Sequence, residues 1–305
     1  MKSGYIIGML LRKILQPTFL KRLVINLSSR EIELQPGLIL RKGNVFKYKP
    51  LTSGASLAQI LEIITDNKIY FPRPSQLNDP EEGRPKLFIG DISDPTYWPR
   101  VKGWVRRCVS QRRPQPNELQ IQSELKQLTQ KGLEEMVNQA DIDFKAAIEN
   151  RYRILSFAGT PSNRHLWENY AGNFNGVSIE FWADSKFGEN YLVQYSDKPR
   201  NLDLTSINDF EHLIQTVLVK ATNWRRERET RMVFGEPPID QHQPALVDQR
   251  YSFPADCLIG FYIGHRVARD QMRLLLSAIK GREYPVRCYI ARPIPWGERV
   301  LLTPI

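Results

Sequence analysis

The sequence predicts an α+β fold with a mixed, mostly antiparallel sheet and flanking helices. Short strand-like runs alternate irregularly with helical patterns, without the regular strand–helix–strand order that predicts a parallel sheet. Hydrophobic residues make up 41% of the 305 residues and charged residues 25%. These fractions are typical of a globular chain that can bury a sizeable core.

The individual elements follow from local periodicity. Strand-like runs are found at 45–48, 69–71, 154–157, 176–182, 191–195, 230–234, 258–263 and 285–290. Apolar residues at helical spacing predict helices at 56–67, 117–150 and 268–279, and Gly281 stands where a helix end is expected. The stretch 90–116 is rich in Pro and Arg and is predicted to form a loop that extends from the surface.

The domain prediction follows from changes in composition. Residues 1–44 are expected to form a basic N-terminal arm, 45–290 a single α+β domain and 291–305 a C-terminal tail. Within the domain, 91–149 is expected to be an inserted basic loop and helix. The arm is interpreted as packing on the main domain, with peripheral membrane contact as the alternative.

Composition also argues against several classes of protein. No run of about 18 uncharged apolar residues occurs, so no transmembrane helix is expected. The three cysteines lie far apart, which fits a reducing, cytoplasmic location and no disulfide framework. The four histidines show no metal-ligand spacing, and no metal is expected. The oligomeric state is left open.

Positive charge is concentrated in two places. Residues 1–50 hold ten Lys or Arg against Glu31 and Glu33, within a net charge of +10. The second cluster has no acid and is interleaved with Trp98 and Trp104; its arginines are Arg100, Arg106, Arg107, Arg112 and Arg113. Arginine with aromatic residues suits RNA or DNA, since arginine neutralises phosphate and rings stack on bases. Solvated charged faces are the alternative interpretation.

Four polar clusters are candidates for a site. They contain, in order, Tyr48 and Lys49; Asn78 and Asp79; Trp167 and Tyr170; and Glu227, Glu229 and Arg231. For the second pair a turn is the plain alternative, and for the third a place in the core. If the fourth cluster is a strand, its three residues share one face. Two carboxylates and a guanidinium on one face are either an exposed ladder or a functional group.

Taken in order, these clusters resemble the bacterial family labelled "domain of unknown function 2971". The matching segments are FKYKPL (46–51), IYFPRPSQLNDPEE (69–82), ILSFAGTPSNRHLWENYAGNFNGVSIEF (154–181), VQYSDKP (193–199), WRRERETRMVF (224–234) and FPADCLIGFYIG (253–264). The resemblance covers about residues 45–280 and does not by itself imply a reaction.

The layout is also similar in outline to ADP-ribosyltransferases, which use NAD. That resemblance implies that Tyr48 or Lys49 and the loop around Asn78 and Asp79 contact NAD. As a pocket wall, the aromatic pair Trp167 and Tyr170 would hold a planar ring of this co-substrate. The resemblance further implies that Glu229 is catalytic, with Glu227 beside it and Arg231 keeping the carboxylate ionised. The expected activity is ADP-ribosyl transfer to a nucleic-acid or protein acceptor, as in a toxin or defence effector.

Two other classes remain open from the sequence. A metal-dependent nuclease would use Asp79, Glu81 and Glu180 as carboxylate ligands. A non-catalytic nucleic-acid-binding module would rely on the basic clusters. Neither a dinucleotide-binding glycine motif nor a phosphate-binding loop occurs, which argues against a Rossmann enzyme and a nucleotide hydrolase.

Overall fold

The computed structural model describes residues 31–35, 38–78, 85–109, 117–184, 186–198, 201–205, 217–236 and 243–305. The chain divides into two compact units. The described part of unit 1 lies within Leu77–Tyr152 and Lys198–Val219, and that of unit 2 within Arg22–Gln76, Arg153–Asp197 and Lys220–Ile305. The residues Asp79, Glu81, Arg112 and Arg113, which the sequence analysis singles out, lie outside the described residues.

Unit 2 is an α+β body built on one large sheet, as predicted. Ten strands of the described residues form it, in the order β1-β2-β8-β12-β6-β3-β7-β14-β15-β16. Their bounds are β1 Glu31–Gln35, β2 Leu38–Arg41, β3 Gly43–Pro50, β6 Tyr152–Ala158, β7 Gly176–Ala183, β8 Tyr191–Leu192, β12 Glu229–Gly235, β14 Leu258–Gly264, β15 Arg287–Pro293 and β16 Val300–Pro304. Strands β14 and β15 run parallel, while β3–β7, β7–β14 and β15–β16 are antiparallel.

Helices and short elements complete unit 2. The helices are α2 Gly54–Thr65, α6 Arg164–Asn169 and α8 Arg269–Lys280, with the 3-10 helices η1 Pro74–Gln76, η2 Thr222–Glu227 and η3 Ala255–Cys257. The remaining strands are β4 Lys68–Tyr70, β9 Gln194–Tyr195, β11 Val219–Lys220 and β13 Arg250–Ser252. They pair as β4 with β13 and β9 with β11. Ser53 caps α2 through a reciprocal capping box with Ser56, so the helix begins two residues before the predicted start at 56.

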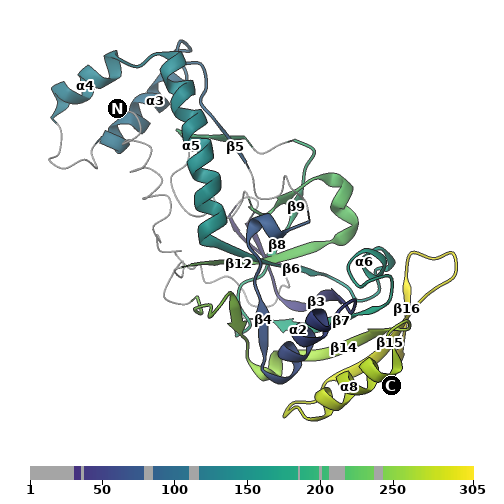
Figure 1. Cartoon of the computed structure of the whole chain (residues 1–305). Helices are drawn as coiled ribbons and strands as arrows, with labels where there is room; N and C mark the ends of the chain where they lie inside the picture. Colours follow the sequence, from purple (N-terminus) through teal and green to yellow (C-terminus); the bar gives the residue numbers. More distant parts are fainter. Residues whose placement is uncertain are drawn as a thin grey trace. The chain divides into compact units, whose positions relative to one another are not determined.

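Two clusters of buried hydrophobic residues pack the helices against the sheet. Helices α2 and α8 contact each other and pack on the larger cluster through Ile60, Ile64 and Leu275, all essentially inaccessible to solvent (Figure 1). The smaller cluster gathers Tyr48 and Trp167 around α6, with ring centroids 5.4 Å apart. Since the side chains of a strand alternate between its faces, one strand such as β3 contributes to both clusters.

Both ends of the expected domain differ from the prediction. The expected arm contains β1 and β2, and β2 joins the sheet through Leu40 opposite Tyr191. The expected tail contains β16, which pairs with β15 and buries Val300. These short strands escape sequence analysis because their stability comes from pairing with strands distant in sequence.

Unit 1 is mainly helical. It contains α3 Trp98–Val109, α4 Glu118–Lys126 and α5 Gln130–Arg151, with β5 Lys86–Phe88 parallel to β10 Asn201–Asp203. The single helix expected over 117–150 is wrong: Thr129 accepts a hydrogen bond from the backbone N–H of Gly132 and so caps a new helix. Residues Trp98–Val109, which were expected to belong to a surface loop, form helix α3.

Helix α3 was not predicted, because its arginines obscure the helical spacing of its apolar residues. Its buried residues Val101, Trp104, Val105 and Cys108 follow helical spacing, so one face packs inward. Trp104 is 1% exposed and is therefore part of the core, not a ring available to stack on a base. Trp98 is half-buried, with the Lys102 ammonium 5.6 Å from its ring centroid.

Candidate functional site

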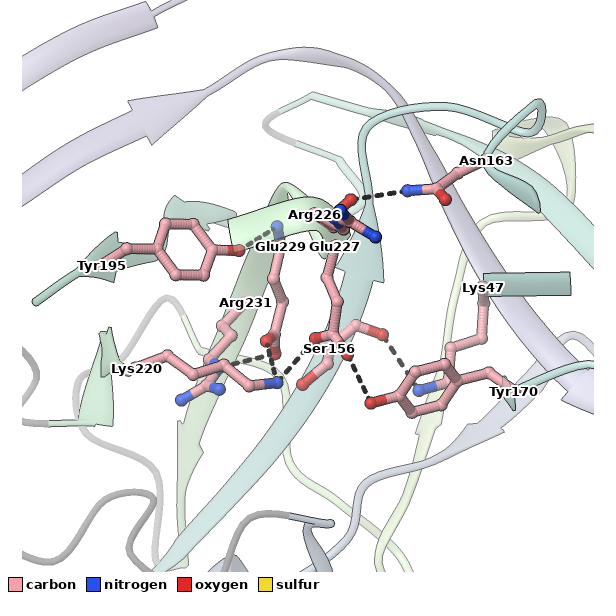
Figure 2. A network of polar contacts seen from close by, with 10 residues as sticks. All are labelled: Lys47, Ser156, Asn163, Tyr170, Tyr195, Lys220, Arg226, Glu227, Glu229 and Arg231. Atoms are coloured by element: carbon pink, nitrogen blue, oxygen red, sulfur yellow. Dashed lines mark hydrogen bonds and ion pairs between the residues drawn. The ribbon is translucent and has the colours of Figure 1, made fainter. Parts of the chain in front are cut away.

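The centre of the candidate site is a buried ion-pair network in unit 2. The Nζ atom of Lys220 lies 2.6 Å from Oε2 of Glu227 and 2.9 Å from Oε2 of Glu229. Nε of Arg231 donates to Oε1 of Glu229 at 2.7 Å (Figure 2). All four residues are at most 6% exposed. Two acids and two bases therefore balance in charge, which is the condition for burying them together.

Local backbone geometry brings the two acids to one lysine. Glu227 ends the 3-10 helix η2 and Glu229 begins strand β12, so the expected single strand carrying both glutamates is wrong. Arg228 stands between them with φ 48° and ψ 52°, the left-handed conformation. This turn lets both carboxylates reach Lys220, an arrangement that two-residue strand periodicity does not predict. A non-glycine residue in this conformation is uncommon and costs energy, which is a recurring feature of functional sites.

Two tyrosines complete the network. The Tyr170 hydroxyl donates to Oε1 of Glu227 at 2.5 Å, and the backbone N–H of Glu229 donates to the Tyr195 hydroxyl oxygen at 2.8 Å. Burial, together with the charge of Glu229 and Glu227, raises the pKa of Tyr195 to about 12. Tyr195 therefore keeps its proton near neutral pH and holds the backbone of Glu229, while Tyr170 holds the carboxylate of Glu227.

Burial shifts the charged groups in opposite directions. It raises the pKa of the Glu229 carboxyl, and the Lys220 ammonium and a hydrogen bond from Ser156 oppose this shift. For Lys220, burial lowers the pKa, but the carboxylates of Glu229 and Glu227 outweigh it and the net shift is upward. Besides Arg231, which the sequence predicts to keep Glu229 ionised, Lys220 is a second cation in direct contact with this carboxylate.

Lys47 stands beside this network. Its Nζ donates to the backbone oxygen of Ser156 at 2.9 Å. Burial and the neighbouring Lys49 lower the pKa of Lys47 to about 8, while the two glutamates act in the opposite direction. Among the described residues, Lys47 is thus a cation held near its point of neutralisation close to a pair of carboxylates.

A pocket of about 540 Å³ opens beside Glu229. Its lining residues are Arg41, Leu192, Val193, Tyr195, Arg225, Arg226, Arg228 and Glu229. Within the described ranges, no carboxylate lies at ion-pair distance from the four arginines. Arg41 is placed by Gly159, where a Cβ atom would stand 3.0 Å from Nη1 of the guanidinium. Four guanidinium groups that have no ion-pair partner among the described residues thus surround one buried carboxylate, and guanidinium groups are well suited to hold an anion.

The structure brings together only part of the predicted site. Tyr170, Glu227, Glu229 and Arg231 meet in the network. Tyr48 and Trp167 contact each other but are core residues: the Tyr48 hydroxyl donates to the backbone oxygen of Thr160, and the Trp167 indole to that of Pro161. They do not line the pocket, contrary to expectation.

The other predicted contacts lie elsewhere. Lys49 donates to the side chain of Gln59 at 3.1 Å. Asn78 is an exposed residue of unit 1. Glu180, considered as a metal ligand, is buried on β7 and accepts hydrogen bonds from Asn44 and Tyr262. No group of three or more His, Cys, Asp or Glu residues suited to a metal ion occurs in the part of the chain that is described.

The arginines predicted to bind nucleic acid make contacts inside unit 1. Arg100 pairs with Asp203 at 3.1 Å, and Arg106 with Glu118 at 2.6 Å. Arg107 donates to the backbone oxygen of Thr205 at 2.7 Å. Each of these described arginines already has an oxygen partner, which lowers its availability for phosphate.

Sequence reasoning missed most of the pocket. It did not select Lys47, Lys220, Ser156, Tyr195, Arg41, Arg225, Arg226 or Arg228. A usable signal existed for three of them, because Arg225 and Arg226 directly precede the Glu-Arg-Glu motif and Arg228 is its central residue. Arg41, Lys47 and Tyr195 reach the site from strands distant in sequence, so no local pattern indicates them.

Comparisons with known proteins find no match, so a function can be inferred only from the geometry of the site. No family model, no curated protein and no solved structure matches the chain. Membership of the family of unknown function therefore stays a prediction. Among the helices of the described residues, none has the length and apolar character needed to cross a bilayer.

Proposed function

We propose that this chain binds NAD in the pocket beside Glu229 and transfers its ADP-ribosyl group to an acceptor. The observation that carries the proposal is the pocket itself, in which four arginines that have no carboxylate partner in the described part of the chain surround one buried glutamate. The order of elements supports it, since the Glu-Arg-Glu motif enters a late strand, as the resemblance to ADP-ribosyltransferases implies.

The arginines would hold the pyrophosphate of NAD. Guanidinium groups bind phosphate oxygens through two parallel hydrogen bonds, and Arg225, Arg226 and Arg228 present three such groups from one short segment. Arg41 faces the same pocket from strand β2. The side chain of Tyr195 offers an aromatic wall of the kind that planar rings pack against.

Glu229 would act on the ribose. In the transfer, the bond between the ribose carbon and the nicotinamide nitrogen breaks, and nicotinamide leaves as a neutral molecule with the bonding electron pair. The acceptor forms the new bond to that carbon and loses a proton to water. A carboxylate beside the ribose stabilises the positive charge that develops on it. Lys220 and Arg231 would fix the orientation of this carboxylate through their ion pairs.

The test is incubation with NAD labelled in the adenylate part, together with mixed protein and nucleic-acid acceptors. Glu229→Gln keeps the shape of the side chain and removes its charge, so we expect labelling to fall by at least a hundredfold while NAD still binds. Glu180→Gln is the matched control, because Glu180 is equally buried in unit 2 but does not line the pocket. Equal labelling by the wild type and Glu229→Gln would refute the proposal.

A further inference from the structure

The turn between β15 and β16 carries an unusual tryptophan. Trp296 is fully exposed, with a relative accessibility of 104%. It has φ 58° and is the third residue of a turn that the hydrogen bond from Gly297 N–H to Ile294 oxygen closes at 3.1 Å. Glycine or asparagine is the usual choice at such a position, and here the glycine comes one residue later.

This placement costs stability twice. A bulky aromatic residue in the left-handed conformation is strained, and its ring gains nothing from burial. Strained, solvent-facing residues cluster at binding and catalytic sites, where the cost is offset by a ligand. Trp296 therefore has the properties of a contact residue and not those of a structural one.

Backbone contacts hold the turn next to the pocket. The N–H of Val300 donates to the Ser162 oxygen at 3.1 Å, and the N–H of Arg164 donates to the Glu298 oxygen at 3.1 Å. Asn163 forms a β-bridge with Arg299. The Asn163 side chain then donates to the backbone oxygen of Arg226, a pocket residue, at 2.6 Å (Figure 2).

Arginines continue from the turn to the pocket. Arg299, Arg226 and Arg225 are exposed. In the described part of the chain, none has a carboxylate within ion-pair distance. Directly bridged residues of antiparallel segments project to the same face, so Arg299 lies on the side from which Asn163 reaches Arg226.

We propose that this surface, formed by Trp296, Arg299, Arg226 and Arg225, binds single-stranded nucleic acid. A base stacks on the exposed indole, and the phosphates of the following nucleotides contact the arginines. A polyanion suits several neighbouring cations that have no carboxylate partner among the described residues better than a protein partner does, because the cores of protein interfaces are depleted in charged residues. The surface is distinct from the α3 cluster. It shares Arg225 and Arg226 with the pocket beside Glu229, and its binding of nucleic acid does not require ADP-ribosyl transfer.

The test measures binding of a fluorescein-labelled twelve-nucleotide oligo(dT) and oligo(rU) to the whole chain, without NAD. We expect Trp296→Ala to weaken binding about tenfold and Trp296→Phe to retain most of it, since a phenyl ring also stacks. Arg299→Ser should weaken binding and reduce the slope of log affinity against log salt by about 0.7. Both residues are exposed, so circular dichroism should show unchanged folding.

Matched controls lie elsewhere in unit 2. Trp182 is 44% exposed at the opposite end of β7 from the turn, and Arg273 is an exposed residue of α8. We expect Trp182→Ala and Arg273→Ser to bind like the wild type. Absence of wild-type binding at 50 mM salt, or equal losses in the controls, would overturn the proposal. Trp296-dependent binding to anionic vesicles or to a protein, with no binding to either oligonucleotide, would overturn it as well.

Discussion

The arginines of helix α3 and those of the pocket beside Glu229 have the same chemistry and opposite surroundings. In α3, each described arginine of the predicted cluster contacts an oxygen of its own unit: Arg100 that of Asp203, Arg106 that of Glu118 and Arg107 that of Thr205. The pocket arginines surround a buried carboxylate, Glu229, which is itself bound to Lys220 and Arg231.

Charge density along a chain therefore does not locate a charged site. The stretch from Arg100 to Arg113 contains no acid, yet Arg100 and Arg107 find their oxygen partners far along the chain, at Asp203 and Thr205. The segment 225–231 beside the pocket contains two glutamates, which lower its net positive charge. Those glutamates are turned inward to Lys220, and the arginines are left facing solvent.

The largest expected effect contrasts a buried ion pair with an exposed one. Lys220→Met leaves two buried carboxylates without their shared cation, and we expect the free energy of unfolding to fall by about 3–5 kcal/mol. Arg106→Met breaks a pair in which both side chains are at least half exposed, and its effect should stay below about 1 kcal/mol. Urea unfolding at pH 7 measures both. Similar losses in the two variants would show that the network is not a coupled buried unit.

An intermediate effect concerns binding by the two groups of arginines. With ADP as the probe for a pyrophosphate, we expect Arg225→Ser and Arg41→Ser each to weaken affinity about tenfold, as for loss of a hydrogen bond to a charged group. Arg100→Ser and Arg107→Ser should change it by less than twofold. Isothermal titration calorimetry at constant ionic strength measures all four. Equal weakening by both groups would mean that ADP responds only to net charge.

The smallest expected effect is the pH dependence that Lys47 contributes. Its pKa is about 8 in the folded chain and 10.5 when unfolded, so the unfolded state binds more protons between these values. Stability due to Lys47 therefore rises from pH 8 to about pH 10.5, as the cost of burying its charge is relieved. Below pH 8 that cost is constant.

Unfolding of the wild type and Lys47→Met across pH 7–10 measures this contribution. The wild type should gain stability relative to the variant above pH 8. The same change at the exposed Lys68 controls for loss of a positive charge. Parallel curves for the wild type and Lys47→Met would contradict the assigned pKa of Lys47 and its burial beside the network.

Elements with strong local periodicity are predictable from the amino-acid sequence. The strand over 176–182, the helix over 268–279 ending at Gly281 and the strand over 258–263 all stand within about a residue of their predicted bounds. Their apolar residues alternate or repeat at fixed spacing because each element buries one face or stripe. The same reasoning predicted the α+β class and selected Glu227, Glu229 and Arg231 as a charged group that must be paired.

Which side chains share a site depends on the tertiary structure and is not visible in any local sequence pattern. Lys47 from β3, Tyr195 from β9 and Arg41 from β2 reach the region of Glu229 because strands distant in sequence pair there. The same pairing sent Tyr48 and Trp167 into the core, although their sequence context equally suited a pocket wall. A local pattern shows which face of an element is apolar. Which partner covers that face depends on long-range packing, and this packing places Arg225, Arg226 and Arg228 around one pocket.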